Sequence, residues 1–502
     1  MSLKGKFGAR VAVLAAILGV ELFGSSCGDY FRPVANPILQ PGGDPQRTAH
    51  ALVVSSNGSN QGTAVIIDVS GDTAAAVFSD SPDCVKCGVG RNPVYAVALE
   101  GTDYVVSRDD DSVADFTVAS AGNPPNIISS LPAGASPVFA AVAQSKLFVA
   151  DFGTNGVAVI SGNNFTPPEI HVGPNPVALV APPAPYDTQL YSLNQGDNTV
   201  SVIFPATNQN VTTISLPAGL KPVWGAASSD GTRVFVVNQG SHNVSVIDTA
   251  SDTVISTLDV GADASPNYIT YEATLNRAYV TSPAGNSLSI IENATGNAPT
   301  VTIRTMAGPP CNGQDPISVT ALADGTRVYV ADDVTSSVCV LNTVNNAFVK
   351  SIQVDATPVG IASNSDSTRV YTANKGTAVF SIASVSRVNN PATGAAAVTV
   401  TTTSNNPFAI GQLVTVAGVG DSTFDGQFGV IAVNSPTQFV YSQTCAVQAQ
   451  CPNSSSSGGT ATILPDVSII ETSDDTTVKS SDGVAPLTIP AGGTPTFITM
   501  TP

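Results

Sequence analysis

The chain has 502 residues, with 37 acidic and 19 basic side chains and a formal charge of −18. Such an acidic surface repels nucleic acid and anionic lipid headgroups, so the composition excludes both as expected partners. Only 11% of the residues are charged, and Asn, Ser, Thr, Asp and Gly supply the polar surface instead, which is typical of exported all-β proteins.

The N-terminus has the pattern of a secretory signal. Three basic residues in the first ten precede an apolar run over residues 11–19, which is too short to predict a membrane span. Residues 24–27 read Gly-Ser-Ser-Cys and resemble the lipobox of bacterial lipoproteins, so we predict a signal peptide over 1–26 and lipidation of Cys27. Plain secretion with cleavage nearby is the alternative, because Gly24 stands where Leu is usual and Glu21 interrupts the apolar run.

A lipid anchor would place the protein at a membrane of the bacterial cell envelope, either in the periplasm or on the cell surface. Residues 28–47 contain four Pro and a Gly pair, which indicates an extended tether over 27–47.

Residues 221–261 contain the clearest copy of a repeated unit of four short strands. Residues 223–227 form a short apolar run, and Ser229-Asp230-Gly231 is a turn signal because Gly tolerates the positive φ of a reversal. Three further runs, β-branched or alternating, follow later turn signals at 233–237, 244–247 and 254–258. Four antiparallel strands in about 40 residues predict one blade of a β-propeller.

The opening of this unit, a Pro before a short strand, recurs at Pro93, Pro137, Pro176, Pro222, Pro266, Pro316, Pro358 and Pro495. Up to Pro358 the spacings are 44, 39, 46, 44, 50 and 42 residues, a variation that loops of different length explain. We therefore predict an all-β fold, a propeller of eight four-stranded antiparallel blades. Seven blades is the alternative, and the divergent repeat at 266–310 is the one in doubt.

The second strand of the unit and its turn carry a recognisable motif, which reads YVVSRDDDSVADF at 104–116, VFVVNQGSHNVSVID at 234–248, VYVADDVTSSVCVLN at 328–342 and VYTANKGT at 370–377. These segments resemble the YVTN repeats of surface-layer-type and YncE-like β-propellers, and lactonase-type propellers show the same strand pattern. The resemblance covers roughly residues 48–376 and 465–502. It implies the fold and says little about chemistry.

The two ends of the chain are predicted to share one blade. Residues 51–55, 64–69 and 73–78 have the patterns of second, third and fourth strands without a first, whereas residues 496–501 follow an opening Pro with nothing after them. We expect a Velcro closure, in which the C-terminal strand is the innermost strand of the N-terminal blade. Such a closure removes the exposed sheet edges of an open stack.

The last repeat is interrupted by an insertion. Its second strand ends near residue 377, but the expected third strand appears only at 466–472. Between them, four alternating runs at 397–403, 412–419, 426–433 and 437–443 predict a small inserted β-barrel or sandwich over 378–464, leaving 48–377 and 465–502 to the propeller. Loops between second and third strands lie on the same face as the connections between blades, so the insert should project from that face.

Six cysteines remain beside Cys27, and an even number in an exported chain predicts disulfides. The simplest pairs are local: Cys84 with Cys87, Cys311 with Cys339, and Cys445 with Cys451. Cys339 could instead be a buried free thiol, and Cys84-Val-Lys-Cys87 could be half a metal site or a redox motif. No second CxxC is present for a zinc site, and Gly88 replaces the His of a haem-attachment motif.

The sequence offers a weak case for catalysis. Its three histidines, His50, His171 and His242, lie before a strand, at a strand end and in a turn. His171 and His242 could reach one face of a propeller, but the convergent Glu, Arg and His set of lactonase-type propellers cannot be assigned here. No GxSxG, HExxH or phosphate-binding Gly-rich loop is present, so we assign no catalytic residue.

Aspartate clusters at 109–111, 332–333 and 474–475 are the candidate cation ligands. Ca²⁺ prefers several carboxylate and carbonyl oxygens, but these residues occur at turns, where Asp caps backbone N–H groups, and none forms a DxDxDG loop. We therefore predict no cofactor and no metal ligand, with Ca²⁺ at these turns as the alternative.

These observations favour a monomeric, non-enzymatic binding or scaffold protein of the cell envelope, whose insert-bearing face recognises a protein or glycan. A lactonase-like hydrolase with a site in the axial funnel is the first alternative, and a structural envelope component is the second. The side chains at the funnel mouth discriminate between them: convergent ionisable groups favour catalysis, whereas a polar Ser, Thr and Asn lining together with a broad insert surface favours recognition.

Overall fold

The computed structural model describes residues 50–80, 86–128, 131–162, 164–262, 264–376, 379–390, 395–404, 408, 412–444, 452–479 and 487–501. The predicted signal peptide, Cys27 and the whole of the predicted tether lie outside these residues, as do Cys84, Cys445 and Cys451. Within the described part of the chain, no helix has the length and apolar character needed to cross a membrane.

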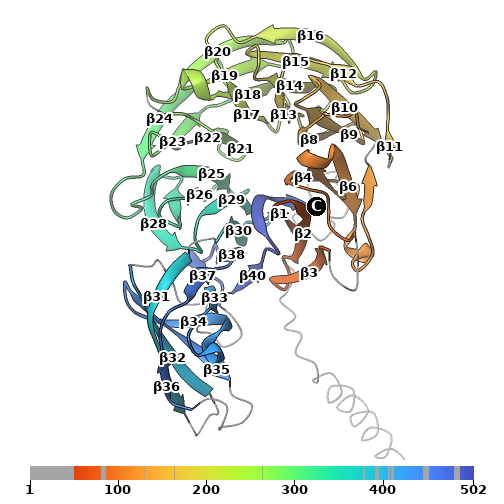
Figure 1. Cartoon of the computed structure of the whole chain (residues 1–502). Helices are drawn as coiled ribbons and strands as arrows, with labels where there is room; N and C mark the ends of the chain where they lie inside the picture. The colour runs from red at the N-terminus through yellow and green to blue at the C-terminus, as the bar shows by residue number, and fades with distance from the viewer. Residues whose placement is uncertain are drawn as a thin grey trace, which may run out of the picture. The chain divides into compact units, whose positions relative to one another are not determined.

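The repeats form eight antiparallel sheets, the blades of a propeller, which Figure 1 colours in chain order. From the innermost strand outward, the first four blades are as follows: blade 1 is β41 (Thr494–Thr501), β1 (His50–Asn57), β2 (Asn60–Asp68) and β3 (Thr73–Phe78); blade 2 is β4 (Pro93–Leu99), β5 (Thr102–Ser107), β6 (Ser112–Phe116) and β7 (Asn126–Ile128); blade 3 is β8 (Pro137–Ala143), β9 (Lys146–Asp151), β10 (Gly156–Ser161) and β11 (Asn164–Phe165), with β12 (Ile170–His171) also pairing β10; blade 4 is β13 (Pro176–Val180), β14 (Leu190–Asn194), β15 (Thr199–Phe204) and β16 (Gln209–Ser215).

The remaining four blades follow the same order: blade 5 is β17 (Pro222–Ala227), β18 (Arg233–Asn238), β19 (Asn243–Asp248) and β20 (Thr253–Asp259); blade 6 is β21 (Tyr268–Glu272), β22 (Arg277–Ser282), β23 (Ser287–Glu292) and β24 (Thr300–Thr305); blade 7 is β25 (Pro316–Ala321), β26 (Arg327–Asp332), β27 (Ser337–Asn342) and β28 (Ala347–Gln353); blade 8 is β29 (Pro358–Ser363), β30 (Arg369–Asn374), β38 (Asp466–Glu471) and β39 (Thr476–Thr477), with β40 (Thr488–Pro490) also pairing β38. Short 3₁₀ turns lie at η1 (Arg108–Asp110), η2 (Val118–Ser120), η3 (Gln239–Ser241) and η4 (Ser422–Phe424).

The innermost strands form a closed ring. Neighbouring strands contact one another in the unbroken series β41, β4, β8, β13, β17, β21, β25, β29 and back to β41. The prediction of eight blades is confirmed and the seven-blade alternative is wrong, because the divergent repeat forms the complete sheet of blade 6. Second and third strands are buried on both faces between neighbouring blades, which is why they read as nearly continuous apolar runs.

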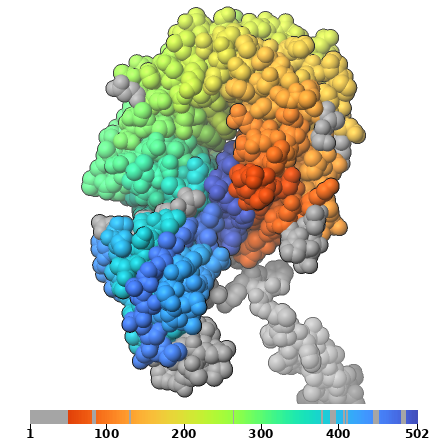
Figure 2. Space-filling model, viewed as in Figure 1, coloured from red at the N-terminus to blue at the C-terminus, as the bar shows by residue number. Residues whose placement is uncertain are grey.

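The predicted Velcro closure is confirmed. Strand β41 pairs antiparallel with β1, with Thr501 opposite His50 and Ile498 opposite Val53. Figure 2 shows the blue C-terminal segment directly against the red N-terminal strand. The closing strand comes from the far end of the sequence, so blade 1 is complete only with both ends of the described chain in place.

In blades 4, 7 and 8 the tyrosine of the YVTN-like motif joins the blade to the next one. The hydroxyl of Tyr371 in blade 8 donates to Asp72 of blade 1 at 3.0 Å, and that of Tyr329 in blade 7 donates to Asp475 of blade 8 at 2.6 Å. Tyr191 in blade 4 donates to Asp252 of blade 5 at 3.0 Å. Each acceptor lies in the turn between the third and fourth strands of the following blade, so the motif tyrosine is an inter-blade tie.

The last residue of the second strand follows the aromatic residue by three positions and makes its contacts at the opposite end of the blade. Asn238 donates through Nδ2 to Ser245 of the third strand at 2.8 Å. A Cβ on Gly219, in the preceding inter-blade connection, would lie 2.7 Å from that same Nδ2, so only glycine lets the connection pass this closely. The motif therefore fixes the path by which each connection enters the centre of the propeller.

The insertion in blade 8 forms a small barrel rather than a sandwich. Strands β30 and β38 pair across it, with Asn374 opposite Asp466. Its strands close in the order β32 (Ala395–Thr402), β35 (Gln438–Thr444), β34 (Gly426–Ser435), β33 (Leu413–Ala417), β37 (Thr460–Ile463) and β31 (Val379–Asn390), with β31 pairing β32 and also β36 (Ser454–Ser456). The four predicted strands are present, and β31, β36 and β37 are additional.

We predict that Tyr371→Phe lowers the free energy of unfolding by about 2 kcal/mol, because it removes a hydrogen bond to a buried, charged acceptor. Urea denaturation measures the change. Tyr279→Phe is the matched control, since Tyr279 holds the equivalent position in β22 but its hydroxyl makes no hydrogen bond to the next blade among the described residues. Equal losses in the two variants would contradict the inter-blade role of Tyr371.

Candidate binding site at the centre of the propeller

A β-bulge at the start of the first strand shapes the centre. In blade 2, Pro93 lies opposite Ser107 and Tyr95 opposite Val106, so Val94 between them is left out of the ladder. The same slip follows the opening Pro in seven of the eight first strands. A bulge bends the strand and redirects side chains. Each of these blades can therefore turn two successive residues toward the axis.

The residues at and after the bulges line an axial cavity of about 280 Å³. The first residue after each opening Pro forms a half-buried rim, which consists of Val94, Val138, Val177, Val223, Asn267, Ile317, Val359 and Thr496. The next residue of each strand lies beside the rim and is aromatic in five blades: Tyr95, Phe139, Trp224, Tyr268 and Phe497. The cavity is completed by Ser318, Gly360, Ile361 and Ile498.

The five aromatic side chains contact one another across the axis. The ring centroids of Tyr95 and Phe139 are 3.9 Å apart, and those of Tyr95 and Phe497 are 4.4 Å apart. Trp224 lies edge-on to Phe139 at 5.1 Å and beside Tyr268 at 4.7 Å. Contacts of this kind add about 0.5–1.5 kcal/mol each beyond the apolar area they bury. The cluster is thus a preformed aromatic wall.

The polar groups of the cavity are neutral. Burial, followed by the nearby Tyr268 hydroxyl, raises the pKa of Tyr95, and burial raises the pKa of Tyr268 to about 12. The Asn267 amide donates to the carbonyl of Ile317 at 2.8 Å and accepts from Thr281 Oγ1 at 2.7 Å. The cavity can therefore stack against a planar apolar group and offer hydroxyl hydrogen bonds to it.

None of the described lining residues is an acid, a histidine, a lysine or an arginine. The structure places the three histidines elsewhere. His50 Nε2 contacts Asp103 Oδ2 at 2.9 Å, and His171 is the exposed last residue of β12. His242 accepts a hydrogen bond from the Ser265 amide through Nδ1 at 3.1 Å. His171 and His242 are not brought together at the cavity.

Several of the predicted turn aspartates accept hydrogen bonds from backbone amides or side chains of neighbouring segments. Asp111 accepts from the amides of Gly134 and Ser136, both at 2.7 Å, and Asp110 accepts from the Arg91 amide at 2.7 Å. The backbone carbonyl of Asp474 accepts from Lys350 at 2.9 Å. The Ca²⁺ alternative at these turns stays a prediction.

Among the cysteines, Cys311 and Cys339 form a disulfide with their Cα atoms 5.3 Å apart, so Cys339 is not a free thiol. Cys87 is buried and disulfide-bonded. Its pairing with Cys84 stays a prediction because Cys84 lies outside the described residues, and the pairing of Cys445 with Cys451 does so for the same reason.

Buried carboxyl groups lie at the ends of blades 3, 7 and 8. Burial and then the Glu169 carboxylate raise the pKa of Asp151 to about 9, and burial and then Asp315 raise that of Asp332 to about 8. At the root of the insert, burial raises the pKa of Asp355, and burial together with Asp355 raises that of Asp466. The Asp151 and Asp332 carboxyls therefore hold their protons at neutral pH, because a buried charge without a partner is costly.

The sequence analysis missed both the aromatic wall and Asp151. The aromatic residues follow the opening Pro at a fixed distance of two positions, and Asp151 follows the aromatic Phe148 by three positions, as Asn238 follows Phe235. Aligning the repeats on their opening Pro would have found the aromatic wall, and aligning them on the aromatic residue of the second strand would have found Asp151.

Comparisons with known proteins leave the family open. No protein-family model and no curated protein matches the sequence. Among solved structures, hydrazine synthase of Kuenenia stuttgartiensis has a TM-score of 0.47 at 18% identity, over 56% of this chain and 92% of that chain. Virginiamycin B lyase of Staphylococcus aureus has a TM-score of 0.45 at 14% identity, over 56% of this chain and 91% of that chain. The periplasmic gluconolactonase PpgL of Pseudomonas aeruginosa has a TM-score of 0.45 at 16% identity, over 62% of this chain and 97% of that chain.

We predict that Asp151→Asn makes stability less dependent on pH. A carboxyl whose pKa rises from about 4 in the unfolded chain to about 9 in the fold binds its proton more tightly when folded. Its contribution to the free energy of unfolding is complete below about pH 4 and is lost as pH rises to about 9, by at most about 1.4 kcal/mol per unit.

The melting temperature of the variant relative to wild type should therefore increase between pH 5 and pH 8.5, a window that lies inside the range between the two pKa values of about 4 and about 9. Asp109→Asn, in an exposed turn, is the control and should follow the wild-type profile. Parallel profiles for wild type and Asp151→Asn would show that the Asp151 carboxyl does not titrate as stated.

Proposed function

We propose that this protein is a non-enzymatic binding protein that holds a small, planar, largely apolar group in its axial cavity. The observation that carries the proposal is the aromatic wall, in which Tyr95, Phe139, Trp224, Tyr268 and Phe497 converge from five blades. A cavity of about 280 Å³ is close to the lower bound of ligand sites, about 300 Å³. It suits one or two fused rings.

The cavity and the insert share one face of the propeller. The start of β29 lies opposite the end of β30, with Pro358 paired to Asn374. The cavity residues Val359 and Gly360 directly follow Pro358, and the chain enters the insert shortly after Asn374. A protein or glycan that presents a ring to the cavity would therefore meet the insert on the same face, which joins the two recognition surfaces.

The location of the protein is part of this proposal. The signal-like segment over 1–26, the lipobox-like Cys27 and the buried disulfide all agree with an exported, lipid-anchored protein of the cell envelope. The tyrosine ties described above agree with repeats of the YVTN type. A monomer is expected, because ring closure leaves no sheet edge at the centre to pair with a second copy.

Trp224 is the single tryptophan of the chain and lines the cavity, so its fluorescence reports on the site alone. We predict that 2-naphthol changes the Trp224 emission with one saturable site per chain. Val223→Asp should weaken this binding about tenfold or more, because the cavity would then have to accept a charge beside an apolar ring.

Val211→Asp is the matched control. It makes the same change on the outer strand β16, where Val211 is 43% exposed, and should bind 2-naphthol as wild type does. The absence of saturable quenching in wild type, or equal affinity in Val223→Asp, would contradict the proposed site. Release of acid from γ- or δ-lactones by wild-type protein in a pH-stat would support the hydrolase alternative instead.

A further inference from the structure

The ends of blades 4, 5 and 8 share one hydrogen bond that blade 7 lacks. In these three blades an Asn at the end of the second strand donates through Nδ2 to a Ser hydroxyl of the third strand, in the pairs Asn194 with Ser201, Asn238 with Ser245 and Asn374 with Ser468, at 2.8 to 3.0 Å. In blade 7 the same register places Asp332 where the Asn stands and Cys339 where the Ser stands. A neutral donor and acceptor pair has thus become a carboxyl beside a sulfur.

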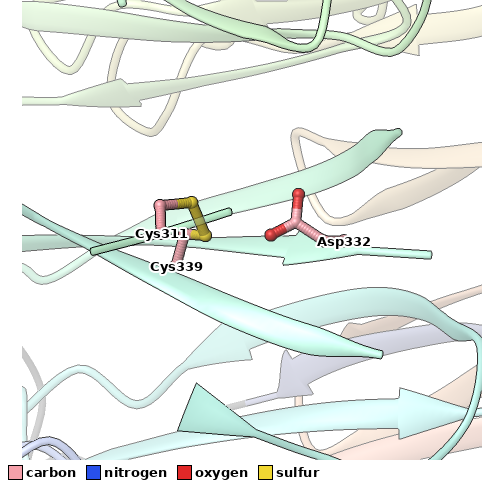
Figure 3. Close-up of side chains that lie close together, drawn as sticks. All are labelled: Cys311, Asp332 and Cys339. Carbon is pink, nitrogen blue, oxygen red and sulfur yellow. A yellow bond between two sulfur atoms is a disulfide. The ribbon is translucent and has the colours of Figure 1, made fainter. Parts of the chain in front are cut away.

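A third group joins this pair from outside the sheet. Cys311, in the connection between β24 and β25, reaches Cys339 and forms the disulfide, and Figure 3 shows the Asp332 carboxyl beside it. The two sulfurs and a carboxylate oxygen lie within 4.8 Å of one another. All three residues are at most 2% exposed, so the cluster is shielded from solvent.

The Asp332 carboxyl is poorly satisfied at this position. Asp332 is fully buried and neither of its oxygens makes a hydrogen bond of good geometry among the described residues, although the Ser337 hydroxyl, opposite it in the ladder, interacts with the carboxyl. A Cβ on Gly313 would lie 2.6 Å from Asp332 Oδ2, so the backbone of the connection that carries Cys311 packs directly against the carboxyl, and only glycine fits there. A poorly satisfied buried polar group is costly, and coordination to a cation is one way to satisfy it.

We infer that reduction of the Cys311–Cys339 disulfide converts this cluster into a site for a thiophilic divalent cation such as Zn²⁺, with both cysteine thiolates and the Asp332 carboxylate as ligands. Two sulfurs, one carboxylate oxygen and an open fourth position form a ligand set that Zn²⁺ accepts. The sulfurs must separate from a bonded pair to about 3.8 Å, the edge of a tetrahedron with metal–sulfur bonds of about 2.3 Å.

The chemistry balances with an external thiol or phosphine reductant. A dithiol gives two electrons and two protons to the disulfide, so the S–S bond breaks, two thiols form and the reductant becomes a cyclic disulfide. A phosphine gives the two electrons and becomes a phosphine oxide, while one water molecule supplies the oxygen of the oxide and the two thiol protons. The cation then displaces the thiol protons and the carboxyl proton, which pass to solvent, and forms two metal–sulfur bonds and one metal–oxygen bond. In an oxidising compartment the disulfide is the resting state, so the site would respond to reduction.

Cadmium titration of the full-length exported protein tests this inference. The protein is reduced with a phosphine, desalted without oxygen and titrated with Cd²⁺, and the thiolate-to-cadmium charge-transfer absorbance is recorded with the near-ultraviolet circular dichroism. We expect one tight equivalent at this cluster in the reduced protein, beside weaker binding by the other reduced cysteines, and no charge-transfer band in the oxidised protein. Asp332→Asn should weaken binding about tenfold or more, since the loss of even an outer-shell partner costs that much.

Two variants separate this site from the other cysteines. Cys311→Ser/Cys339→Ser keeps Cys84, Cys87, Cys445 and Cys451 and should lose the tight equivalent. Asp151→Asn changes the equivalent acid of blade 3, where Ala158 stands in place of the sulfur, and should bind as wild type does. The inference is overturned if reduction unfolds the protein, if the folded reduced protein binds no cadmium, or if Asp332→Asn and Asp151→Asn bind equally.

Discussion

The pairing of β41 with β1 is the constraint on which the rest of the structure depends. A blade with both faces apolar is stable only between two other blades, so a row of blades has two exposed ends until it closes. Strand β41 removes both ends, because it completes blade 1 and contacts the first strands of blades 2 and 8. Closure also sets the number of first strands that share the axis, and hence the width of the cavity that they enclose.

The repeated motif connects neighbouring blades through two separate contacts. The tyrosine hydroxyl ties the outer turn of the next blade, as Tyr371 does to Asp72 across the closure. The residue three positions later fixes the strand end near the axis, where glycine lets the preceding connection pass. Since the same four-residue segment serves both ends of the blade, the β-bulges that follow the connections recur in register, and their side chains meet at one level on the axis.

The architecture could be predicted from the sequence because its signals are local and repeated. Opening prolines, turn glycines and the YxxN spacing each describe one blade, and the unpaired strand after Pro495 fits one place in an incomplete first blade.

The candidate site could not be predicted in the same way. Tyr95 and Trp224 are 129 positions apart in the sequence, and nothing local indicates that their rings lie within 6.2 Å of each other. Strand β31 was missed because its alternation of apolar residues with Ser was assigned to no sheet. The protonation of Asp151 depends on its burial, which a single polar residue at the end of a strand does not reveal.

The dependence of blade 1 on both chain ends has a consequence for how the protein is made. Thr501 and His50 are separated by 451 positions, so their ladder is among the last contacts that a chain emerging in N-to-C order can form. During synthesis β1 has no inner neighbour until β41 is available, and its backbone groups on that side remain open to other strands. Blades 2 to 7 have all their strands consecutive in sequence and can assemble in turn as they emerge. The topology therefore sets an order of assembly. Blades 2 to 7 can form first, and the ring closes only when β41 is available to pair with β1.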